Sequence, residues 1–152
     1  CALPICRWEV RPMGSLELLP NELQTKLLSV AEKSRGIEGV IVNVAIGYGG
    51  RIEIVDAVKS VITESAKSGK SAEEIAEALS IEDINKNLYT AGQPDPELVI
   101  RTSGEQRLGG FLLWQSAHSE FYFCEAYWPD FRKVDFLRAL RAYSARERRF
   151  GS

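Results

Sequence analysis

Cysteine and histidine are scarce in this sequence, and their scarcity limits the metal sites that it can build. The chain has 152 residues but a single histidine, His118, and three cysteines, at positions 1, 6 and 124. No Cys-x-x-Cys pair is present, so a zinc site made of cysteine and histidine is excluded and any metal must be held by oxygen. Free, unpatterned cysteines are typical of a reducing compartment, so we expect a cytoplasmic protein.

Long apolar runs and net charge are also lacking. No apolar run reaches the roughly 18 residues that a membrane-spanning helix needs. Nineteen Lys and Arg residues nearly balance 21 Asp and Glu residues, and a formal net charge of -2 argues against a nucleic-acid-binding surface. With 45% apolar and 26% charged residues, the composition is that of an ordinary globular protein. We therefore expect one folded, soluble domain that does not bind nucleic acid.

The first six residues carry no functional weight in our interpretation. The chain does not begin with methionine, and residues 1–6 are too short, and lack the basic start, for a signal peptide. Ala2 to Ile5 also match what a common sequencing adaptor encodes in one reading frame. We expect residues 1–6 to be an artefact or a disordered start, ahead of one domain over 7–152.

The hydrophobic pattern predicts alternating strands and helices. Residues 40–46 and 98–100 are β-branched apolar runs, typical of strands buried on both faces of a parallel sheet. Periodicity alone leaves 111–117 open as helix or strand. The other predicted elements are a strand over 7–10 ended by Pro12–Gly14, helices over 20–36, 54–69, 71–79, 80–88 and 136–143, and a strand over 121–124. This order predicts an α/β fold with a parallel sheet flanked by helices.

A glycine-rich turn is predicted between the strand over 40–46 and the helix that follows. Small residues at Gly47, Gly49 and Gly50 would let backbone N–H groups approach an anion, and Arg51 adds positive charge at the helix start. A tight turn in which Arg51 pairs with a nearby carboxylate explains the same residues equally well.

The segment after the strand over 98–100 carries the strongest binding signal. Arg101 and Arg107 stand six residues apart in a loop that also holds three glycines and two hydroxyl residues. The loop follows the carboxyl end of a strand, where open α/β sheets bind ligands. A guanidinium group can bind two phosphate oxygens at once, and loop N–H groups can add further donors. The pattern favours a phosphate or diphosphate site, and the alternative is a surface loop with ordinary ion pairs.

Glu120 and His118 are the other candidate polar groups. Glu120 stands between an apolar segment and three aromatic residues, so its carboxylate is expected either to pair with a cation or to coordinate Mg²⁺. From this pattern alone, pairing is the favoured alternative. His118 lies beside apolar residues and is expected to be a packed or surface residue rather than a catalytic base.

Several blocks of this sequence together resemble one family. They match in order and in spacing, and the central block is long and specific. The blocks are Asn43–Arg51, Leu98–Arg107, Phe111–Gln115 with Glu120, Trp128–Asp130 and Arg148–Gly151. They resemble the C-terminal part of the cis-prenyltransferases, the undecaprenyl diphosphate synthase family, over residues 7–152.

The resemblance implies an activity, a cofactor and partners. Members of the family condense isopentenyl diphosphate with an allylic diphosphate to form a cis-polyprenyl diphosphate, and they use Mg²⁺. The resemblance also implies a homodimer, a hydrophobic product tunnel beside a parallel sheet, and peripheral membrane association through the lipid product. No covalent nucleophile is expected, since Mg²⁺ and arginines can stabilise a departing diphosphate.

Roles are carried over to the positions that match the family's motifs. Arg101 and Arg107 would hold the isopentenyl diphosphate, Glu120 would bind Mg²⁺, and no residue of this chain is assigned as catalytic. The resemblance further implies that Arg149 and Gly151 of the tail reach toward the diphosphate. The remaining residues assigned to the site are Gly109, which binds substrate, and Ser103, Glu105 and Arg51, which support it.

Two departures from the family pattern bear on activity. Gly109 stands where many members have a serine, so that position keeps a backbone N–H group but has no hydroxyl. The family's N-terminal strand, its Mg²⁺-binding aspartate and the first tunnel helices have no counterpart in residues 1–152. We therefore expect a transferase fragment that is inactive alone. The alternatives are a non-catalytic partner subunit of a cis-prenyltransferase and a generic phosphate-binding α/β module.

Overall fold

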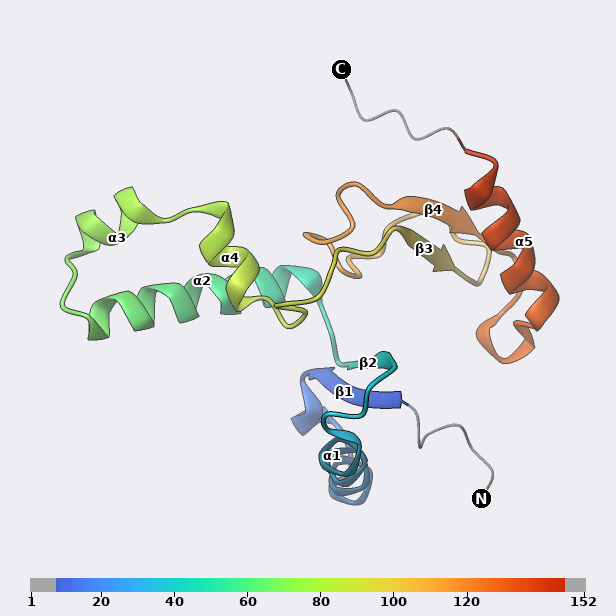
Figure 1. Cartoon of the computed structure of the whole chain (residues 1–152), viewed down its shortest axis with the longest axis horizontal. Helices are drawn as coiled ribbons and strands as arrows, with labels where there is room; N and C mark the ends of the chain where they lie inside the picture. The colour runs from blue at the N-terminus through green and yellow to red at the C-terminus, as the bar shows by residue number, and fades with distance from the viewer. Residues whose placement is uncertain (1–7, 147–152) are drawn as a thin grey trace. The chain divides into compact units, whose positions relative to one another are not determined.

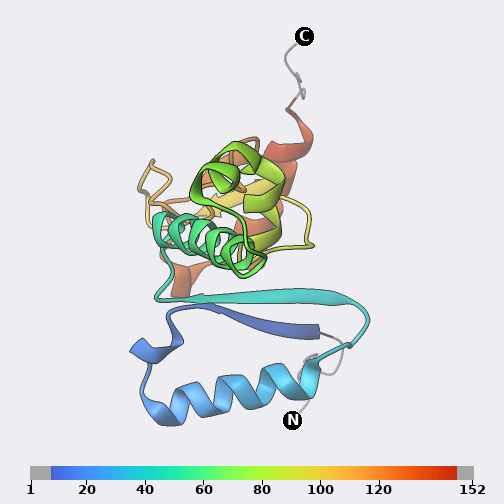
Figure 2. The ribbon, with the colours of Figure 1, turned by 90° about the vertical axis from the view of Figure 1, so that its left-hand side faces the viewer.

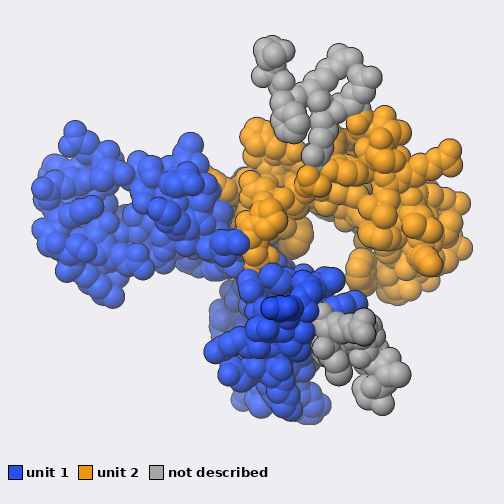
Figure 3. All heavy atoms as spheres, in the orientation of Figure 1, with its two compact units in different colours: residues 1–92 blue, residues 93–152 orange. Residues whose placement is uncertain are grey.

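The computed structural model describes residues 8–146, and it divides into two compact units. One unit covers residues 1–92 and the other covers residues 93–152 (Figure 3). Each unit contains one pair of parallel strands and at least one helix packed against it. Residues 1–6, interpreted above as an artefact or disordered start, lie outside the described residues, as do Arg149 and Gly151.

The first unit is built around two parallel strands, β1 (Trp8–Gly14) and β2 (Val40–Ile46). Their register pairs Trp8 with Val40 and Gly14 with Ile46. The 3₁₀ turn η2 (Leu16–Leu18) and helix α1 (Asn21–Ser34) connect the strands, and α1 packs along β1 (Figure 2). The Ser34 hydroxyl at the end of α1 accepts a 2.9 Å hydrogen bond from the Val10 N–H group. The predicted helix and the predicted strand over 40–46 are both confirmed.

Two details of this strand pair differ from the prediction. Pro12 was expected to end the first strand, but β1 continues to Gly14. Among the described residues β1 pairs with β2 alone, and an edge strand tolerates a residue that lacks an N–H group. Burial of β2 on both faces was also expected, yet Val40 and Ile41 are 55% and 42% exposed. The described sheet has two strands and therefore leaves much of β2 uncovered.

Three helices complete the first unit: α2 (Gly50–Lys67), α3 (Ala72–Ala78) and α4 (Ile81–Asn87). Both shorter helices pack against α2 (Figure 1). Ser71 and Ser80 each cap the following helix by accepting a hydrogen bond from the N–H group of the third helical residue, as the sequence predicts. The buried apolar side chains of this helical layer are Ala57, Val61, Ile84 and Leu88.

The second unit pairs β3 (Leu98–Arg101) with β4 (Glu120–Phe123) in parallel. The short 3₁₀ helix η3 (Trp128–Asp130) follows, and α5 (Lys133–Ser144) packs against β4. Both strands and the terminal helix confirm the predicted elements. The segment over 111–117 forms turns and is neither helix nor strand, and the left-handed backbone of Leu112 interrupts any regular repeat there.

The predicted fold class, parallel strands flanked by helices, is confirmed. The strands form two separate pairs, one in each unit, where a single sheet was expected. No helix within residues 8–146 combines the length and the apolar character that a membrane crossing requires.

Candidate functional site

The arginine loop, residues 101–110, begins where β3 ends. The carbonyl of Arg101 accepts a 2.7 Å hydrogen bond from the Cys124 N–H group just after β4. The N–H groups of Ser103 and Gly104 donate to the carbonyls of Ala126 and Cys124, each at 2.9 Å. These bonds hold the first part of the loop to the chain that follows β4. They also occupy both N–H groups.

Glu105 joins the two arginines of the loop. The Arg101 guanidinium forms an ion pair with the Glu105 carboxylate and donates to the Arg107 carbonyl oxygen. Arg107 approaches the same Glu105 oxygen, with both Nε and Nη2 at 2.9 Å from Oε2. One carboxylate oxygen therefore serves both guanidinium groups. The Arg101 side chain is 23% exposed and that of Arg107 is 71% exposed, so one arginine is largely covered and the other faces solvent.

The charges of the loop favour an anion between the arginines. The hydrogen bond from Arg107, together with the nearby positive charge of Arg101, holds the pKa of the Glu105 carboxyl below its usual range. Glu105 is therefore ionised at neutral pH, and its oxygen occupies a place that suits a phosphate oxygen equally well, since forked guanidinium groups bind carboxylates and phosphates alike. The loop is thus a candidate anion site whose internal counter-anion is Glu105.

Gly109 makes a close approach to Arg101 possible. Its backbone is left-handed, with φ of +65°, and a Cβ atom at this position would lie 2.6 Å from Arg101 Nη1. An ordinary side chain would therefore meet the guanidinium that Glu105 holds. The present position of Arg101 therefore depends on Gly109, the residue that stands where many family members have a serine.

Glu120 lies at the other end of the strand pair. It begins β4 beside Leu98, whereas Arg101 pairs with Phe123. Three residues of strand span about 10 Å, so within this unit the structure does not bring Glu120 to the arginine loop. Glu120 instead forms an ion pair with Arg146, which also donates to the Phe121 carbonyl at 3.3 Å. Pairing, the alternative that the sequence pattern favoured, is what the structure shows.

Among the described residues, Glu120 alone is proposed as a protein ligand for a magnesium ion. Within residues 8–146, no three His, Cys, Asp or Glu side chains converge on a point that could hold a metal. Mg²⁺ is often bound by one or two carboxylates, with waters and substrate phosphates completing the shell. Glu120 is an oxygen donor, is 31% exposed and already attracts a cation, so it fits as one such carboxylate.

Arg51, the supporting residue predicted in the first unit, is exposed in the first turn of α2. The turn before it is held by Glu53, which the sequence analysis missed. Glu53 is completely buried, accepts a hydrogen bond from the Tyr48 hydroxyl, and accepts another from the Tyr89 N–H group at 2.8 Å. The one available signal was a carboxylate between Ile52 and Ile54, within the apolar stripe of the helix.

Tyr89 extends this cluster on the surface of α2. Its hydroxyl donates to Asp56 Oδ2 at 2.7 Å, and its ring meets that of Tyr48 edge to face, with centroids 6.2 Å apart. Burial, followed by the hydrogen bond to Asp56, raises the pKa of Tyr89 to about 12. The glycine turn, α2 and the chain after α4 are therefore tied together by polar contacts as well as apolar ones.

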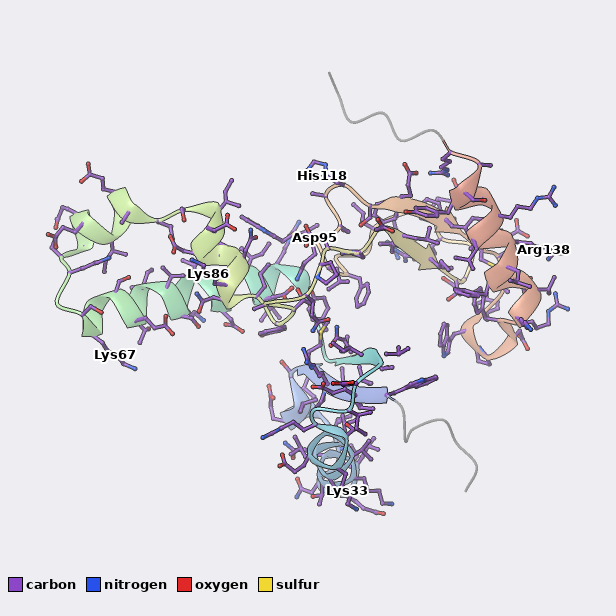
Figure 4. The ribbon with its side chains drawn as sticks, in the orientation of Figure 1. Lys33, Lys67, Lys86, Asp95, His118 and Arg138 are labelled. Atoms are coloured by element: carbon purple, nitrogen blue, oxygen red, sulfur yellow. The ribbon has the colours of Figure 1, made fainter. Side chains whose placement is uncertain are left out.

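His118 is exposed in the segment that leads into β4, and its side chain points away from the ribbon (Figure 4). This placement agrees with the expected surface residue. The predicted tail residues Arg149 and Gly151 lie outside the described residues, so their proposed roles stay predictions.

A family model described as "Putative undecaprenyl diphosphate synthase" matches residues 3–151 of the chain. The chain belongs to the undecaprenyl diphosphate synthase family. The (2Z,6E)-farnesyl diphosphate synthase of Mycolicibacterium smegmatis is 59% identical over 153 residues, covering 99% of this chain and 57% of that relative. Isoprenyl transferase 1 of Streptomyces avermitilis is 56% identical, covering 96% of this chain and 57% of the relative.

A solved structure supports the same membership in this family of cis-prenyltransferases. The chain is 31% identical to lavandulyl diphosphate synthase from Lavandula x intermedia, solved with dimethylallyl diphosphate, and the TM-score is 0.86. The match covers 97% of this chain and 61% of that structure. The chain thus spans about 57% of the length of the curated relatives described above.

Proposed function

We propose that the chain supplies the isopentenyl diphosphate site of a cis-prenyltransferase that makes a cis-polyprenyl diphosphate. The observation that carries the proposal is the single Glu105 oxygen shared by Arg101 and Arg107. Two guanidinium groups that converge on one anionic oxygen are already arranged for a phosphate oxygen. Relatives more than half identical to this chain are named as isoprenyl transferases and a farnesyl diphosphate synthase, which supports this choice of substrate.

The residues of the loop have distinct roles in this proposal. The diphosphate replaces the Glu105 carboxylate between the guanidinium groups, and Arg101, the less exposed of the two, fixes its orientation. Holding isopentenyl diphosphate in one position next to its allylic partner lowers the entropic part of the barrier. When the product leaves, the Glu105 carboxylate again forms ion pairs with the two arginines.

Glu120 is proposed to hold Mg²⁺ for the second, allylic diphosphate. Its separation of about 10 Å from Arg101 along the strands supports two diphosphate positions over one. When bound, Mg²⁺ neutralises charge that develops on a departing diphosphate. Glu120 contributes a carboxylate oxygen, and no covalent nucleophile is needed.

The test uses a completed chain, in which residues 7–152 are joined to the part of the Mycolicibacterium smegmatis relative that they do not cover. Arg101→Ala and Arg107→Ala should each cost about 2–4 kcal/mol of transition-state stabilisation in kcat/KM. Arg→Lys should rescue only in part, because an ammonium group cannot form the bidentate fork. Arg141→Ala, an exposed arginine of α5, is the control for lost charge. Near-normal kcat/KM in both arginine variants would contradict the assignment.

A non-catalytic partner subunit is the second candidate, because the described residues offer one metal carboxylate and no cluster of three. Turnover with isopentenyl diphosphate, farnesyl diphosphate and Mg²⁺ separates the two. If the first proposal holds, the completed chain should be active by itself. If the second holds, it should be active only after a catalytic subunit is added. Tight binding of simple sugar phosphates would instead indicate a generic phosphate-binding module.

The assembly and location of the protein are part of the same proposal. We propose a homodimer in the cytoplasm that associates with the membrane surface through its lipid product. Sedimentation equilibrium of the completed chain tests the dimer. Cell fractionation with and without the isoprenoid substrates tests the membrane association, which should weaken when no product is made.

A further inference from the structure

The last turn of α5 is fastened to the strand pair by two polar contacts. The Tyr143 hydroxyl donates to Glu97 Oε2 at 3.0 Å, next to the start of β3. Arg146, two residues beyond the end of α5, forms an ion pair with Glu120 at the start of β4 and donates to the Phe121 carbonyl at 3.3 Å. Both contacts lie at the end of the strands opposite the arginine loop. One of the two carboxylates involved is the proposed magnesium ligand.

A metal ion at Glu120 and Arg146 would share one carboxylate. The ion pair is made by Glu120 Oε2, and the Arg146 side chain is 49% exposed, so this guanidinium can leave the carboxylate for solvent. A hard divalent cation that takes the oxygen brings two positive charges close to the guanidinium. The repulsion between the two cations makes binding of both to this carboxylate less favourable than binding of either one alone.

Displacement of Arg146 has a consequence for the chain beyond α5. Arg146, the last described residue, ties the end of the described chain to β4. When Arg146 leaves Glu120, one of the two polar contacts described above is lost and the Tyr143 contact remains. Metal occupancy at Glu120 and attachment of Arg146 to β4 are thus linked.

We propose that Arg146 is a positioning residue that competes with the divalent cation for Glu120, so that metal binding releases the end of α5. The inference rests on the proposed function, because it takes Glu120 as the metal ligand. The linkage is reciprocal: metal binding weakens the Arg146 contact by the same factor by which that contact weakens metal binding.

The test measures metal binding by the 152-residue chain itself, with Mn²⁺ as the probe. Broadening of the Glu120 and Phe121 amide resonances in ¹⁵N NMR spectra reports Mn²⁺ bound at this carboxylate, even when binding is weak. Arg146→Met should tighten Mn²⁺ binding about two- to fivefold, the range expected for release of a partly exposed ion pair. Arg146→Lys should give a value close to that of the unchanged chain. Arg141→Met, which removes the same charge from α5, should have less effect.

A second measurement follows the end of the helix. Addition of Mg²⁺ should speed amide exchange at Ala145 and Arg146 severalfold in the unchanged chain, and Arg146→Met should show fast exchange without metal. If Glu120→Gln leaves Mn²⁺ broadening unchanged, the metal assignment fails, and the inference fails with it. If Glu120→Gln abolishes the broadening but Arg146→Met does not tighten binding beyond Arg141→Met, the inference alone is overturned.

Discussion

Replacing Gly109 with alanine tests whether the position of Arg101 matters for diphosphate binding. The new Cβ would lie 2.6 Å from Arg101 Nη1, so the guanidinium must shift from its present position, in which it contacts Glu105 and the Arg107 carbonyl. A hydrogen bond to a charged group contributes about 1.5–3 kcal/mol. Loss of one such bond from Arg101 to the diphosphate should weaken binding about tenfold or more, since 1.4 kcal/mol is a factor of ten.

Gly110→Ala is the matched control for this substitution. Gly110 also has a left-handed backbone, with φ of +80°, but nothing lies within 4 Å of the Cβ it would gain. Both substitutions therefore carry the backbone cost of about 1–2 kcal/mol for an alanine in this region. The difference between them isolates the displacement of Arg101.

The assay is isothermal titration of the chain with inorganic diphosphate, accompanied by thermal unfolding. Both variants should lose similar stability, while Gly109→Ala should bind diphosphate at least tenfold more weakly than Gly110→Ala. Equal affinities in the two variants would refute the reasoning about Arg101. Absence of diphosphate binding by the unchanged chain would count against the proposed function instead.

Three further predictions concern Glu53, Tyr89 and the tail. Glu53→Gln should lower the free energy of unfolding by about 1–3 kcal/mol, because each carboxylate oxygen accepts one hydrogen bond and an amide has a single acceptor oxygen. Urea unfolding measures this loss, with Asp95→Asn as the exposed control. Equal stability of the two variants would contradict the prediction. The pKa of Tyr89 is raised, so its neutral form contributes stability that is complete below pH 10 and is lost as the pH rises toward about 12. Unfolding curves at pH 9 and above pH 11 should show this loss of stability, and the loss should be smaller in Tyr89→Phe. An equal loss of stability in that variant would mean that Tyr89 is not its cause. Deletion of residues 149–152 from the completed chain should raise KM for isopentenyl diphosphate or lower kcat with little change in Tm, and unchanged kinetics would remove the tail from the site.

Local interactions explain why many elements could be predicted. The caps at Ser71 and Ser80 depend on groups three residues away, and the helix over 21–34 depends on an apolar stripe that repeats along the chain. Such contacts form within one segment, so the pattern of residues is enough to identify them. The end of β1 was mispredicted at Pro12. Whether a strand tolerates proline depends on which strands flank it, and the arrangement of strands is a property of the sheet.

The sequence by itself determined the order of strands and helices, the family membership and the choice of Arg101 and Arg107. All three follow from residue types and their spacing along the chain. Only the tertiary structure showed that one Glu105 oxygen serves both arginines, that Glu53 is buried, and that Glu120 lies beside Arg146 at the far end of the strands. These depend on strand register, loop closure and burial, which bring together groups that are distant in sequence, and a linear pattern does not specify those distances.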